Sequence, residues 1–406
     1  MNIDFIAEQA YRHIHFISVK IGSRPTGGQA EQEAFSYLSE QLAQWGYAIE
    51  SQSVLFSVPP RWFIPYGLGG LYLALCGLCI KSLPIFALTP PLLFYLLPYF
   101  TRKAIQSRKK DQISQNIFTE LPDENAPSPL FILSAHVDTA KASCFTKPIT
   151  LIINYFILFI AQRIAIALSS FSLLLLLNIS IPYPITLFLQ AASVITGIWL
   201  FLSHLIDQFI SENHYSPGAN DNASGVGVLL AIAEELNKPE YSNQLGNIKV
   251  SFLFTGAEET GVHGAEAFAS KLIGRQVAVL CLDMVGCGND ILYVTKDGTF
   301  MPLKTSTFLN NYMKKVSPTL IPIEYTIKSG DFAAFCKNKI HASCIQTKGT
   351  IPQEIAYHTI YDTIDIINKN TLKIVIQFIF QLIYLLNEHA KEIPLYENED
   401  IVINKK

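Results

Sequence analysis

The segment from Ser216 to Val228, SPGANDNASGVGV, constrains this chain of 406 residues more than any other. Its proline, glycine and asparagine residues are turn formers, and the apolar residues of 223–236 recur at helical spacing. The segment therefore predicts a turn that presents the carboxylate of Asp221 at the start of a helix. Taken alone, the pattern fits an ordinary helix cap formed by Asp221 or Asn222. The other segments decide between a cap and a functional carboxylate.

Further apolar segments with the composition of strands end in side chains that can bind metal ions. FILSA runs into His136 and Asp138, VSFLFTGA into Glu258 and Glu259, and VAVLCL into Asp283, while AYHTIYDT adds His358. Because ligands of open α/β sheets gather at the carboxyl ends of the strands, one topology can bring these side chains together. Two histidines, three carboxylate ligands and one further glutamate suit two divalent ions.

The segments HVD, GANDNASGVG, GAEE, LDMVG and YHT, in this order, resemble the co-catalytic zinc aminopeptidases of metallopeptidase family twenty-eight, clan MH. GSRPTGG at 22–28 and the closing HTIYDTID also resemble that family's pattern. The resemblance covers about 1–57, 128–140 and 214–390, and leaves out two hydrophobic blocks. It implies an α/β fold in which a mixed sheet carries helices on both faces.

The resemblance also implies a metal centre of two co-catalytic zinc ions bridged by Asp221. His136 and Asp283 would complete one zinc site, and Glu259 and His358 would complete the other. These five residues are therefore the predicted metal ligands.

Three more residues receive catalytic roles from the resemblance. Adjacent side chains of an extended segment point in different directions, so Glu258 can face the attacking water while its neighbour binds metal; Glu258 would be the general base and later the proton donor. Asp138 would orient the imidazole of His136, and Tyr357 would stabilise the tetrahedral oxyanion. The sequence departs from the family at SGDFAAF, where no histidine follows Asp331, and this departure leaves substrate recognition open.

Composition sets the wider bounds. A chain with 50% hydrophobic and 16% charged residues is too apolar for an ordinary soluble enzyme, so part of it is expected in the lipid bilayer. A net charge of −3 without basic stripes gives no nucleic-acid footprint. Seven cysteines are an odd number, and the CxxC pair of Cys76 and Cys79 lies inside an apolar run, so the cysteines suit a reducing compartment rather than a disulfide framework.

Two hydrophobic blocks are predicted to form two transmembrane hairpins with four spans. The first block offers 63–80 and 84–100, although prolines in the second of these also fit a re-entrant or interfacial segment. The second block offers 164–181 and 185–206, with 149–162 as an interfacial lead-in before Arg163. Four spans return the chain to the side of His136 before it reaches Asp221, whereas five do not.

The remaining segments are assigned to the peptidase domain. Residues 1–20 read as an amphipathic helix rather than a signal peptide, 29–45 as a helix, and AIESQSVLFSV as an edge strand. Arg24 is by default an exposed loop residue, and the very apolar helix 371–388 is expected in the core rather than in the membrane. The predicted domain boundaries are 1–57, 102–148 and 207–392 for the peptidase domain, 63–101 and 149–206 for the hairpins, and 393–406 for a flexible tail.

Charge near the spans predicts a cytoplasmic active site, because positive residues close to span ends stay cytoplasmic. Eight basic residues share the side of the catalytic segments, namely Arg61, Arg102, Lys103, Arg108, Lys109, Lys110, Lys141 and Lys147, against Lys81 on the other. Secretion, common in the resembled family, is the opposing alternative. Both hairpins are expected to leave one face of the domain and to hold the active site near the bilayer.

The function that follows is a membrane-bound dinuclear zinc exopeptidase, an aminopeptidase acting on peptides with a free N-terminus through a hydroxide between the metals. Two alternatives stay open: a non-catalytic peptidase-like receptor or chaperone component, and a single-zinc cyclotransferase. Carboxypeptidase action, the preferred residue and the oligomeric state are not predicted.

Overall fold

The computed structural model describes residues 1–57, 63–94, 96, 111–119, 128–142, 148–210, 214–298, 302–325 and 329–395. The chain divides into two compact units, and each is described by itself. Unit 1 comprises Met1–Phe56, Lys110–Lys141 and Tyr215–Lys406, and unit 2 comprises Ser57–Lys109 and Ala142–His214.

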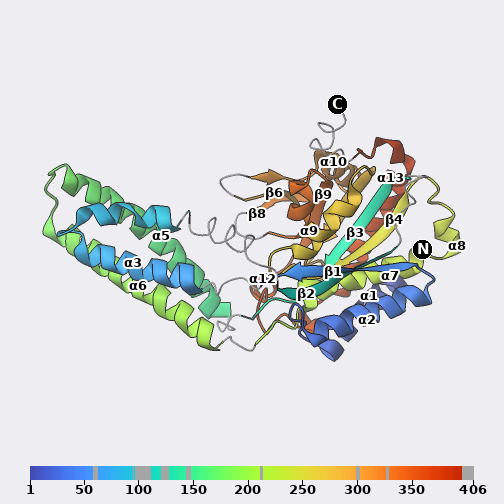
Figure 1. Ribbon diagram of the computed structural model, residues 1–406, viewed down its shortest axis with the longest axis horizontal. Helices are drawn as coiled ribbons and strands as arrows, with labels where there is room; N and C mark the ends of the chain where they lie inside the picture. Colours follow the sequence, from blue (N-terminus) through green and yellow to red (C-terminus); the bar gives the residue numbers. More distant parts are fainter. Residues whose placement is uncertain are drawn as a thin grey trace. The chain divides into compact units, whose positions relative to one another are not determined.

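A mixed sheet of nine strands organises unit 1 (Figure 1). The strands are β1 (Ile49–Phe56), β2 (Gln112–Thr119), β3 (Leu130–His136), β4 (Lys249–Thr255), β5 (Val277–Leu282), β6 (Asp290–Asp297), β7 (Leu303–Lys304), β8 (Ile321–Tyr325) and β9 (His341–Lys348). Their order is β1-β2-β4-β3-β5-β9-β6-β7, with β8 paired to β6. The central strands β4, β3, β5 and β9 are parallel, and β2 and β6 flank them in antiparallel pairing. The predicted mixed α/β fold is confirmed.

Two hydrophobic cores cover the two faces of this sheet. In the fully buried strand β3, Phe131 and Leu133 belong to one core and Leu130 and Ile132 to the other, as the alternation of a strand requires. The larger core adds α1 (Ile3–His15), η1 (Phe16–Ile21), α2 (Gln29–Gln44), α7 (Ser224–Leu236), α10 (Thr307–Val316) and α13 (Lys369–Glu388). The smaller core adds α9 (His263–Ala269), η5 (Ser270–Leu272) and α11 (Asp331–Lys337).

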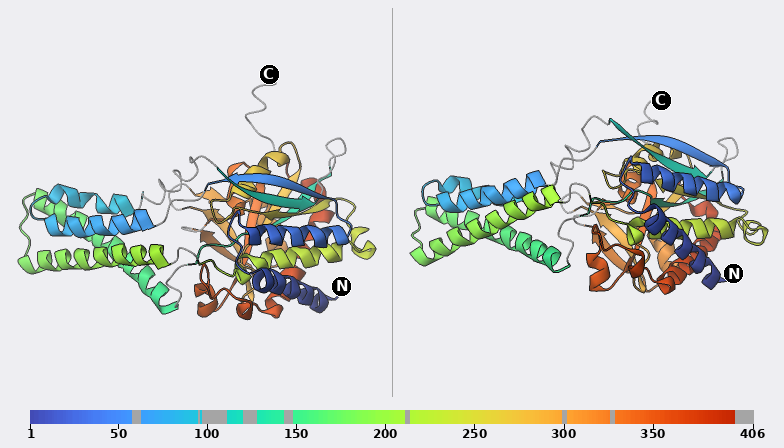
Figure 2. Two further views of the ribbon diagram at one scale, coloured as in Figure 1. Left: turned by 60° about the horizontal axis from the view of Figure 1, so that its bottom comes forward. Right: turned by 90° about the horizontal axis from the view of Figure 1, so that it is seen from below.

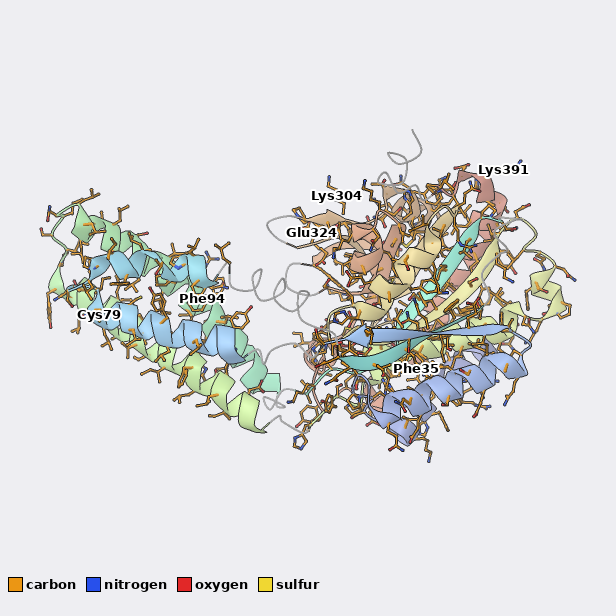
Figure 3. All side chains as sticks on the ribbon, viewed as in Figure 1. Phe35, Cys79, Phe94, Lys304, Glu324 and Lys391 are labelled. Carbon is orange, nitrogen blue, oxygen red and sulfur yellow. The ribbon has the colours of Figure 1, made fainter. Side chains whose placement is uncertain are left out.

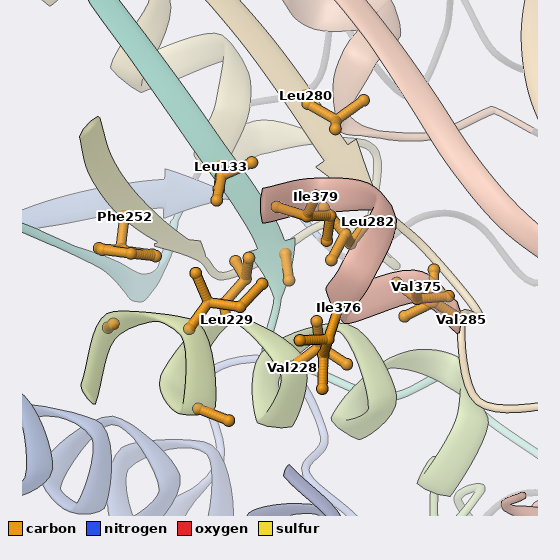
Figure 4. Close-up of a cluster of buried hydrophobic side chains, with 14 of the residues drawn as sticks. Leu133, Val228, Leu229, Phe252, Leu280, Leu282, Val285, Val375, Ile376 and Ile379 are labelled. Atoms are coloured by element: carbon orange, nitrogen blue, oxygen red, sulfur yellow. The ribbon is translucent and has the colours of Figure 1, made fainter. Parts of the chain in front are cut away.

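Helix α7 lies between the sheet and the outer helices α1 and α2 (Figure 2). It is apolar on nearly every side, as expected for a helix enclosed by protein rather than bordered by water. The close-up shows Val228 and Leu229 of α7 in the same buried cluster as Leu133 of β3 and Ile376 of α13 (Figure 4). This packing fixes the helix whose first turn follows Asp221.

Helix α13 is long and apolar enough to cross a membrane by composition. Its buried side chains nevertheless belong to the larger core, and Lys373 on its exposed side pairs with Asp4 of α1 at 2.5 Å. The core assignment predicted from the sequence is therefore the one the structure has.

Unit 2 is built from apolar helices whose side chains project on all sides (Figure 3). They are α3 (Phe63–Cys79), η2 (Pro84–Leu88), α5 (Pro148–Leu176) and α6 (Tyr183–Ile210). Helices α3 and α6 approach closely where Gly70 faces Gly197, because a Cβ on either glycine would collide with the backbone carbonyl of the other.

In the described part of the chain, two helices of unit 2 are long and apolar enough to span a membrane, Phe156–Leu176 and Tyr183–Asp207. The segments Tyr66–Cys79 and Pro84–Phe94 form shorter apolar helices, so the predicted four spans are matched at two positions. The rest of the predicted span 84–100, apart from residue 96, lies outside the described residues.

The lead-in predicted at 149–162 is not a separate helix. Helix α5 runs through Arg163, whose guanidinium lies 4.7 Å from the ring centre of Phe159, so a long side chain lets the charge stay on an apolar helix. The helix ends at Leu176 instead of 181, near Asn178, which adopts a left-handed φ of 59°.

The structure describes part of the basic residues near the predicted spans and part of the predicted flexible tail. Among the basic residues used for the orientation, only Lys81 and Lys141 lie in the described ranges. Residues 393–395 of the predicted flexible tail are packed, since Ile393 is buried and Val277 donates a backbone hydrogen bond to Pro394. Residues 396–406 lie outside the description.

His13 of α1 predicts acid sensitivity of unit 1. Burial lowers the pKa of His13 from 6.5 to about 4, and its Nδ1 lies 2.7 Å from the hydroxyl of Tyr37. The unfolded chain then binds a proton that the folded chain does not, so stability falls by up to roughly 3 kcal/mol as the pH drops from about 6.5 towards 4. His13→Asn should flatten this loss in urea unfolding of the full chain in detergent. An unchanged pH dependence would contradict it.

Candidate metal centre

The predicted metal ligands meet at one edge of the sheet. His136 is the last residue of β3, Glu259 follows β4, and Asp283 follows β5, at the carboxyl ends of three parallel strands. Asp221 lies in η4 (Ala219–Ala223) before α7, and His358 follows α12 (Ile351–Ile355), which comes after β9. The structure thus brings all five residues together from five separate segments.

Asp221 is shared by two groups of ligands. Its Oδ1 lies 3.1 Å from Nε2 of His136, which is 3.9 Å from Oδ1 of Asp283. Its Oδ2 lies 3.1 Å from Nε2 of His358, which is 3.3 Å from Oε2 of Glu259. In each group the ligand atoms lie within 4.8 Å of one another. One carboxylate therefore turns one oxygen towards each of two histidines.

The donor set fits metal ions. Oδ1 of Asp283 and Oε1 of Glu259 are buried and have no hydrogen-bond partner among the residues that the structure describes. A buried carboxylate oxygen without a partner is costly, and a bound cation removes that cost. Imidazole nitrogens together with carboxylate oxygens are the ligand types of zinc centres.

The charges of the site favour cations at the histidines. Burial alone would lower the pKa of His358, but the carboxylates of Glu259 and Asp221 raise it to about 10. Burial opposes the charged form of His136 in the same way, and Glu258 together with other carboxylates raises its pKa well above the usual value. Without metal, the anionic cluster therefore recruits protons onto the two imidazoles, which must release these protons to bind a metal ion.

Asp138 connects His136 to the two glutamates. Nδ1 of His136 lies 3.1 Å from the backbone oxygen of Asp138 and 3.7 Å from its carboxylate. The carboxylate accepts hydrogen bonds from the backbone N–H groups of Glu258 and Glu259, both at 3.1 Å, and from the hydroxyl of Thr26 at 2.7 Å. Asp138 thus holds the turn that carries the Glu-Glu pair as well as lying beside the imidazole.

Glu258 and Tyr357 lie at the same centre. Glu258 forms a group with His136 and Glu259, and burial raises the pKa of its carboxyl well above the usual value. The ring of Tyr357 stacks on that of His358 with centroids 3.7 Å apart. Glu258 and Tyr357, two of the predicted catalytic residues, are therefore beside the predicted metal ligands.

Asp331, where the sequence departs from the family pattern, is buried near the same centre. Its Oδ2 accepts a hydrogen bond from Thr255, and its Oδ1 has no partner in the described ranges. Burial raises the pKa of Asp331 to about 6. The residue after it, Phe332, is fully buried in the smaller core, so an apolar side chain replaces the family's histidine.

The expectation that Arg24 is exposed is wrong. Arg24 is completely buried, and its guanidinium donates hydrogen bonds to backbone carbonyls of three segments. The acceptors are Val137 at 2.8 Å, Gly22 at 2.6 Å, Ile17 at 3.3 Å, Pro217 at 3.0 Å and Gly218 at 3.0 Å. Five N–H donors in a planar fork explain how one side chain joins the loops beside His136 and Asp221.

Asp362 also holds the Asp221 loop, a role that the sequence does not reveal. Its carboxylate accepts hydrogen bonds from the backbone N–H groups of Asn220 at 2.7 Å and Asp221 at 2.9 Å. Burial raises the pKa of Asp362 to about 7. The position lies in the segment HTIYDTID that resembles the family, but the sequence does not show which amides it would bind.

Replacing Arg24 should destabilise the chain strongly. Arg24→Met leaves several buried carbonyls without donors, so the free energy of unfolding should fall by roughly 3–5 kcal/mol in urea titrations of the full chain in detergent. Arg12→Met is the matched control, because the Arg12 side chain is 68% exposed and its change should stay within about 0.5 kcal/mol. Equal effects of both variants would contradict the role of Arg24.

Comparisons with known proteins bear on the fold and on one part of the sequence. The sequence model of peptidase family M28 matches residues 196–383. No curated protein sequence matches the chain. Three solved structures share the fold at sequence identities of 16% to 18%, which show the fold alone.

The leucine aminopeptidase precursor of Bacteroides thetaiotaomicron superposes with a TM-score of 0.53 at 18% identity, covering 93% of this chain and 96% of its own. A zinc aminopeptidase of Bacillus subtilis gives 0.54 at 16% identity, with 93% and 94% covered. The glutaminyl cyclase of Bacteroides thetaiotaomicron, bound to N-acetylhistamine, gives 0.53 at 18% identity, with 93% and 97% covered.

The fold is that of the mixed-sheet zinc exopeptidases. Within that class, the chain resembles peptidase family M28 both in sequence, over residues 196–383, and in fold. Because the same fold serves aminopeptidases and glutaminyl cyclases, the reaction has to be argued from the site.

Proposed function

We propose that this chain is a membrane-bound dinuclear zinc exopeptidase that removes N-terminal residues from peptides with a free α-amine. The observation that carries the proposal is the carboxylate of Asp221, which faces a different histidine with each of its two oxygens. His136 and Asp283 would hold one zinc ion with it, and Glu259 and His358 the other. A carboxylate in this position suits a bridge between two metal ions.

Glu258 and Asp138 would have separate roles in the reaction beside the metal ions. Bound zinc would polarise the scissile carbonyl and lower the pKa of a water molecule. Glu258 takes the proton of the attacking water and returns it to the amine that leaves when the peptide C–N bond breaks. Asp138 holds the backbone of Glu258 in place through its N–H group, so that this carboxylate stays oriented towards the centre.

The donor set favours substrates whose end can itself bind a metal ion. Asp221, Glu258, Glu259 and Asp283 converge at one edge of the sheet, and two zinc ions would balance their negative charges. A neutral N-terminal amine is a metal ligand and could anchor the substrate on one of these ions. The proposal is therefore an aminopeptidase rather than a carboxypeptidase. Tyr357, whose ring stacks on that of His358, would donate a hydrogen bond to the developing oxyanion.

A single-zinc cyclotransferase is the second candidate, because glutaminyl cyclases share this fold as closely as aminopeptidases do. Asp221, Glu259 and His358 alone would suffice for one zinc ion. The second group around His136 and Asp283 favours two ions. A receptor or chaperone without catalysis is disfavoured by the complete set of ligands and the adjacent Glu258.

Membrane attachment and a cytoplasmic active site complete the proposal. Two helices of unit 2 have the length and composition of membrane spans. The excess of basic residues near the spans on the side of the catalytic segments supports the cytoplasmic orientation.

Product analysis separates the two candidate reactions. The full chain, loaded with zinc in detergent, is incubated with a peptide that begins with leucine, its acetylated form, and a peptide that begins with glutamine. We expect free leucine from the first peptide and no cleavage of the acetylated one. Loss of ammonia from the glutamine peptide without shortening would favour the cyclotransferase, and equal cleavage of the acetylated peptide would exclude an exopeptidase that needs a free amine.

Glu258→Gln is the matched variant for this assay. It keeps the size of the side chain and removes its basicity, so turnover should fall by about 10²–10⁴-fold or more while zinc content stays unchanged. A zinc-replete variant with a near-normal rate would remove Glu258 from its role as general base.

A further inference from the structure

The chain crosses between the two units four times, and all four crossing points belong to one edge of unit 1. The crossings follow Phe56 and Lys141 and precede Lys110 and Tyr215. Lys141 comes shortly after the carboxyl end of β3, and it forms an isolated bridge with Tyr215, shortly before the loop of Asp221. One pair of crossings therefore opens beside the metal ligands.

The other pair opens at the same edge because of strand direction. Strand β2 is antiparallel to β4, so its first residue, Gln112, lies at the edge where β4 ends and the Glu258 turn begins. Strand β1 is antiparallel to β2, which brings its last residue, Phe56, to the same edge, and Asp111 donates a backbone hydrogen bond to Phe56 at 3.1 Å. All crossings thus lie at the carboxyl edge of the parallel strands.

The loop 22–28 joins the two pairs of crossings. At one end, the hydroxyl of Ser23 donates to the backbone oxygen of Tyr215 at 3.0 Å. At the other end, Gly27 adopts a φ of +72° and packs so closely that a Cβ would lie 2.9 Å from the ring of Phe56. Between them, Thr26 bonds to Asp138 of the metal centre. The crossings and the metal centre therefore share one continuous border.

Short connections join the apolar helices to this border. Only residues 211–214 separate the end of α6 at Ile210 from Tyr215, a connection of at most about 18 Å when extended. Only residues 142–147 separate Lys141 from the start of α5 at Pro148, a connection of at most about 25 Å. Both membrane-type helices α5 and α6 are therefore tethered to the border by only a few residues.

Exposed apolar side chains occur along the same edge. Ile351 of α12 is 72% exposed, and Ile360 and Tyr361, directly after His358, are 39% and 44% exposed. Leu55 and Ile113, partners across β1 and β2 beside the crossings, are 53% and 59% exposed. Apolar groups along a surface that is tethered to membrane-type helices match a lipid interface.

We propose that the metal-centre edge of unit 1 faces and contacts the bilayer surface, with Ile351, Ile360 and Tyr361 as the lipid-contacting rim of the site. Peptides then reach the metal centre along the membrane interface. The substrate class that follows is peptides held at the bilayer with a free N-terminus, such as lipid-anchored or membrane-adsorbed chains. This substrate class rests on the proposed peptidase function, whereas the orientation does not.

Fluorescence quenching tests the orientation without any activity. Ile351→Cys and, separately, Tyr361→Cys are labelled with a nitrobenzoxadiazole fluorophore in the full chain reconstituted in phosphatidylcholine vesicles, with and without nitroxide-labelled lipid. Ile273→Cys is the matched control, because Ile273 is also an exposed isoleucine (39%) but precedes β5 at the opposite edge of the sheet. The unsubstituted chain, labelled in parallel, gives the contribution of the native cysteines.

We expect the nitroxide lipid to quench the fluorophore at 351 and at 361 several-fold more than at 273. Equal quenching at the two edges, or stronger quenching at 273, would overturn the proposed orientation. Either labelled rim position suffices for this comparison if the other variant does not reconstitute.

The substrate class is tested with Ile351→Glu. Release of leucine from a soluble peptide should stay within about twofold of the unsubstituted chain, while release from the same peptide carrying a C-terminal palmitoyl chain in vesicles should fall at least fivefold. An equal effect of Ile351→Glu on the two rates of leucine release would overturn the substrate class. If the unsubstituted chain cleaves neither peptide, the peptidase function fails, and the quenching result still decides the orientation.

Discussion

The shared carboxylate of Asp221 is the constraint on which the structure of unit 1 depends. Three further carboxylates and two imidazoles converge around it in a largely buried setting, and such a concentration of charge persists only if the surrounding backbone is held firmly. Helix α7, buried except at Glu234, fixes the chain on one side of Asp221. Arg24 donates hydrogen bonds to the backbone carbonyls of Pro217 and Gly218. The carboxylate of Asp362 accepts hydrogen bonds from the backbone N–H groups of Asn220 and Asp221.

The loops around the centre are held by hydrogen bonds, while some oxygens that face the centre lack hydrogen-bond partners among the described residues. The groups that hold the loops are paired with backbone atoms, whereas the groups that face the centre keep oxygens without hydrogen-bond partners in the described residues, on Asp283 and Glu259. Polar atoms held ready in this way would spare the protein a rearrangement on binding a metal ion. The centre is thus prepared by backbone hydrogen bonds made some distance from it.

The residues of the centre can be predicted from the sequence because each predicted ligand follows a recognisable local pattern. His136 and Asp283 end apolar strands, Asp221 begins a helix, and strands of a parallel sheet must bring such ends together. The sequence does not predict the burial of Arg24, because this burial depends on the loops of Gly22, Val137 and Pro217 meeting in space. For the same reason it did not assign the amides that bind Asp362.

The membrane segments show a different limit. Apolar composition identified the two blocks, but the ends of their helices depend on local detail that hydropathy does not carry. Arg163 predicts a boundary in the sequence, but its long side chain can lie along the helix, and α5 ends near Asn178, earlier than the apolar run does. Which edge of the peptidase fold these blocks leave from, in contrast, follows from the direction of β1 and β2, which only the sheet topology reveals.

The central claim is that Asp221 lies between two metal ions. Crystals of the full chain grown with zinc, with diffraction recorded just above and just below the zinc absorption edge, test it most directly. The account predicts two anomalous peaks, one beside each oxygen of Asp221, the first bordered by His136 and Asp283 and the second by Glu259 and His358. A single peak at full zinc occupancy, or a peak away from Asp221, would contradict it.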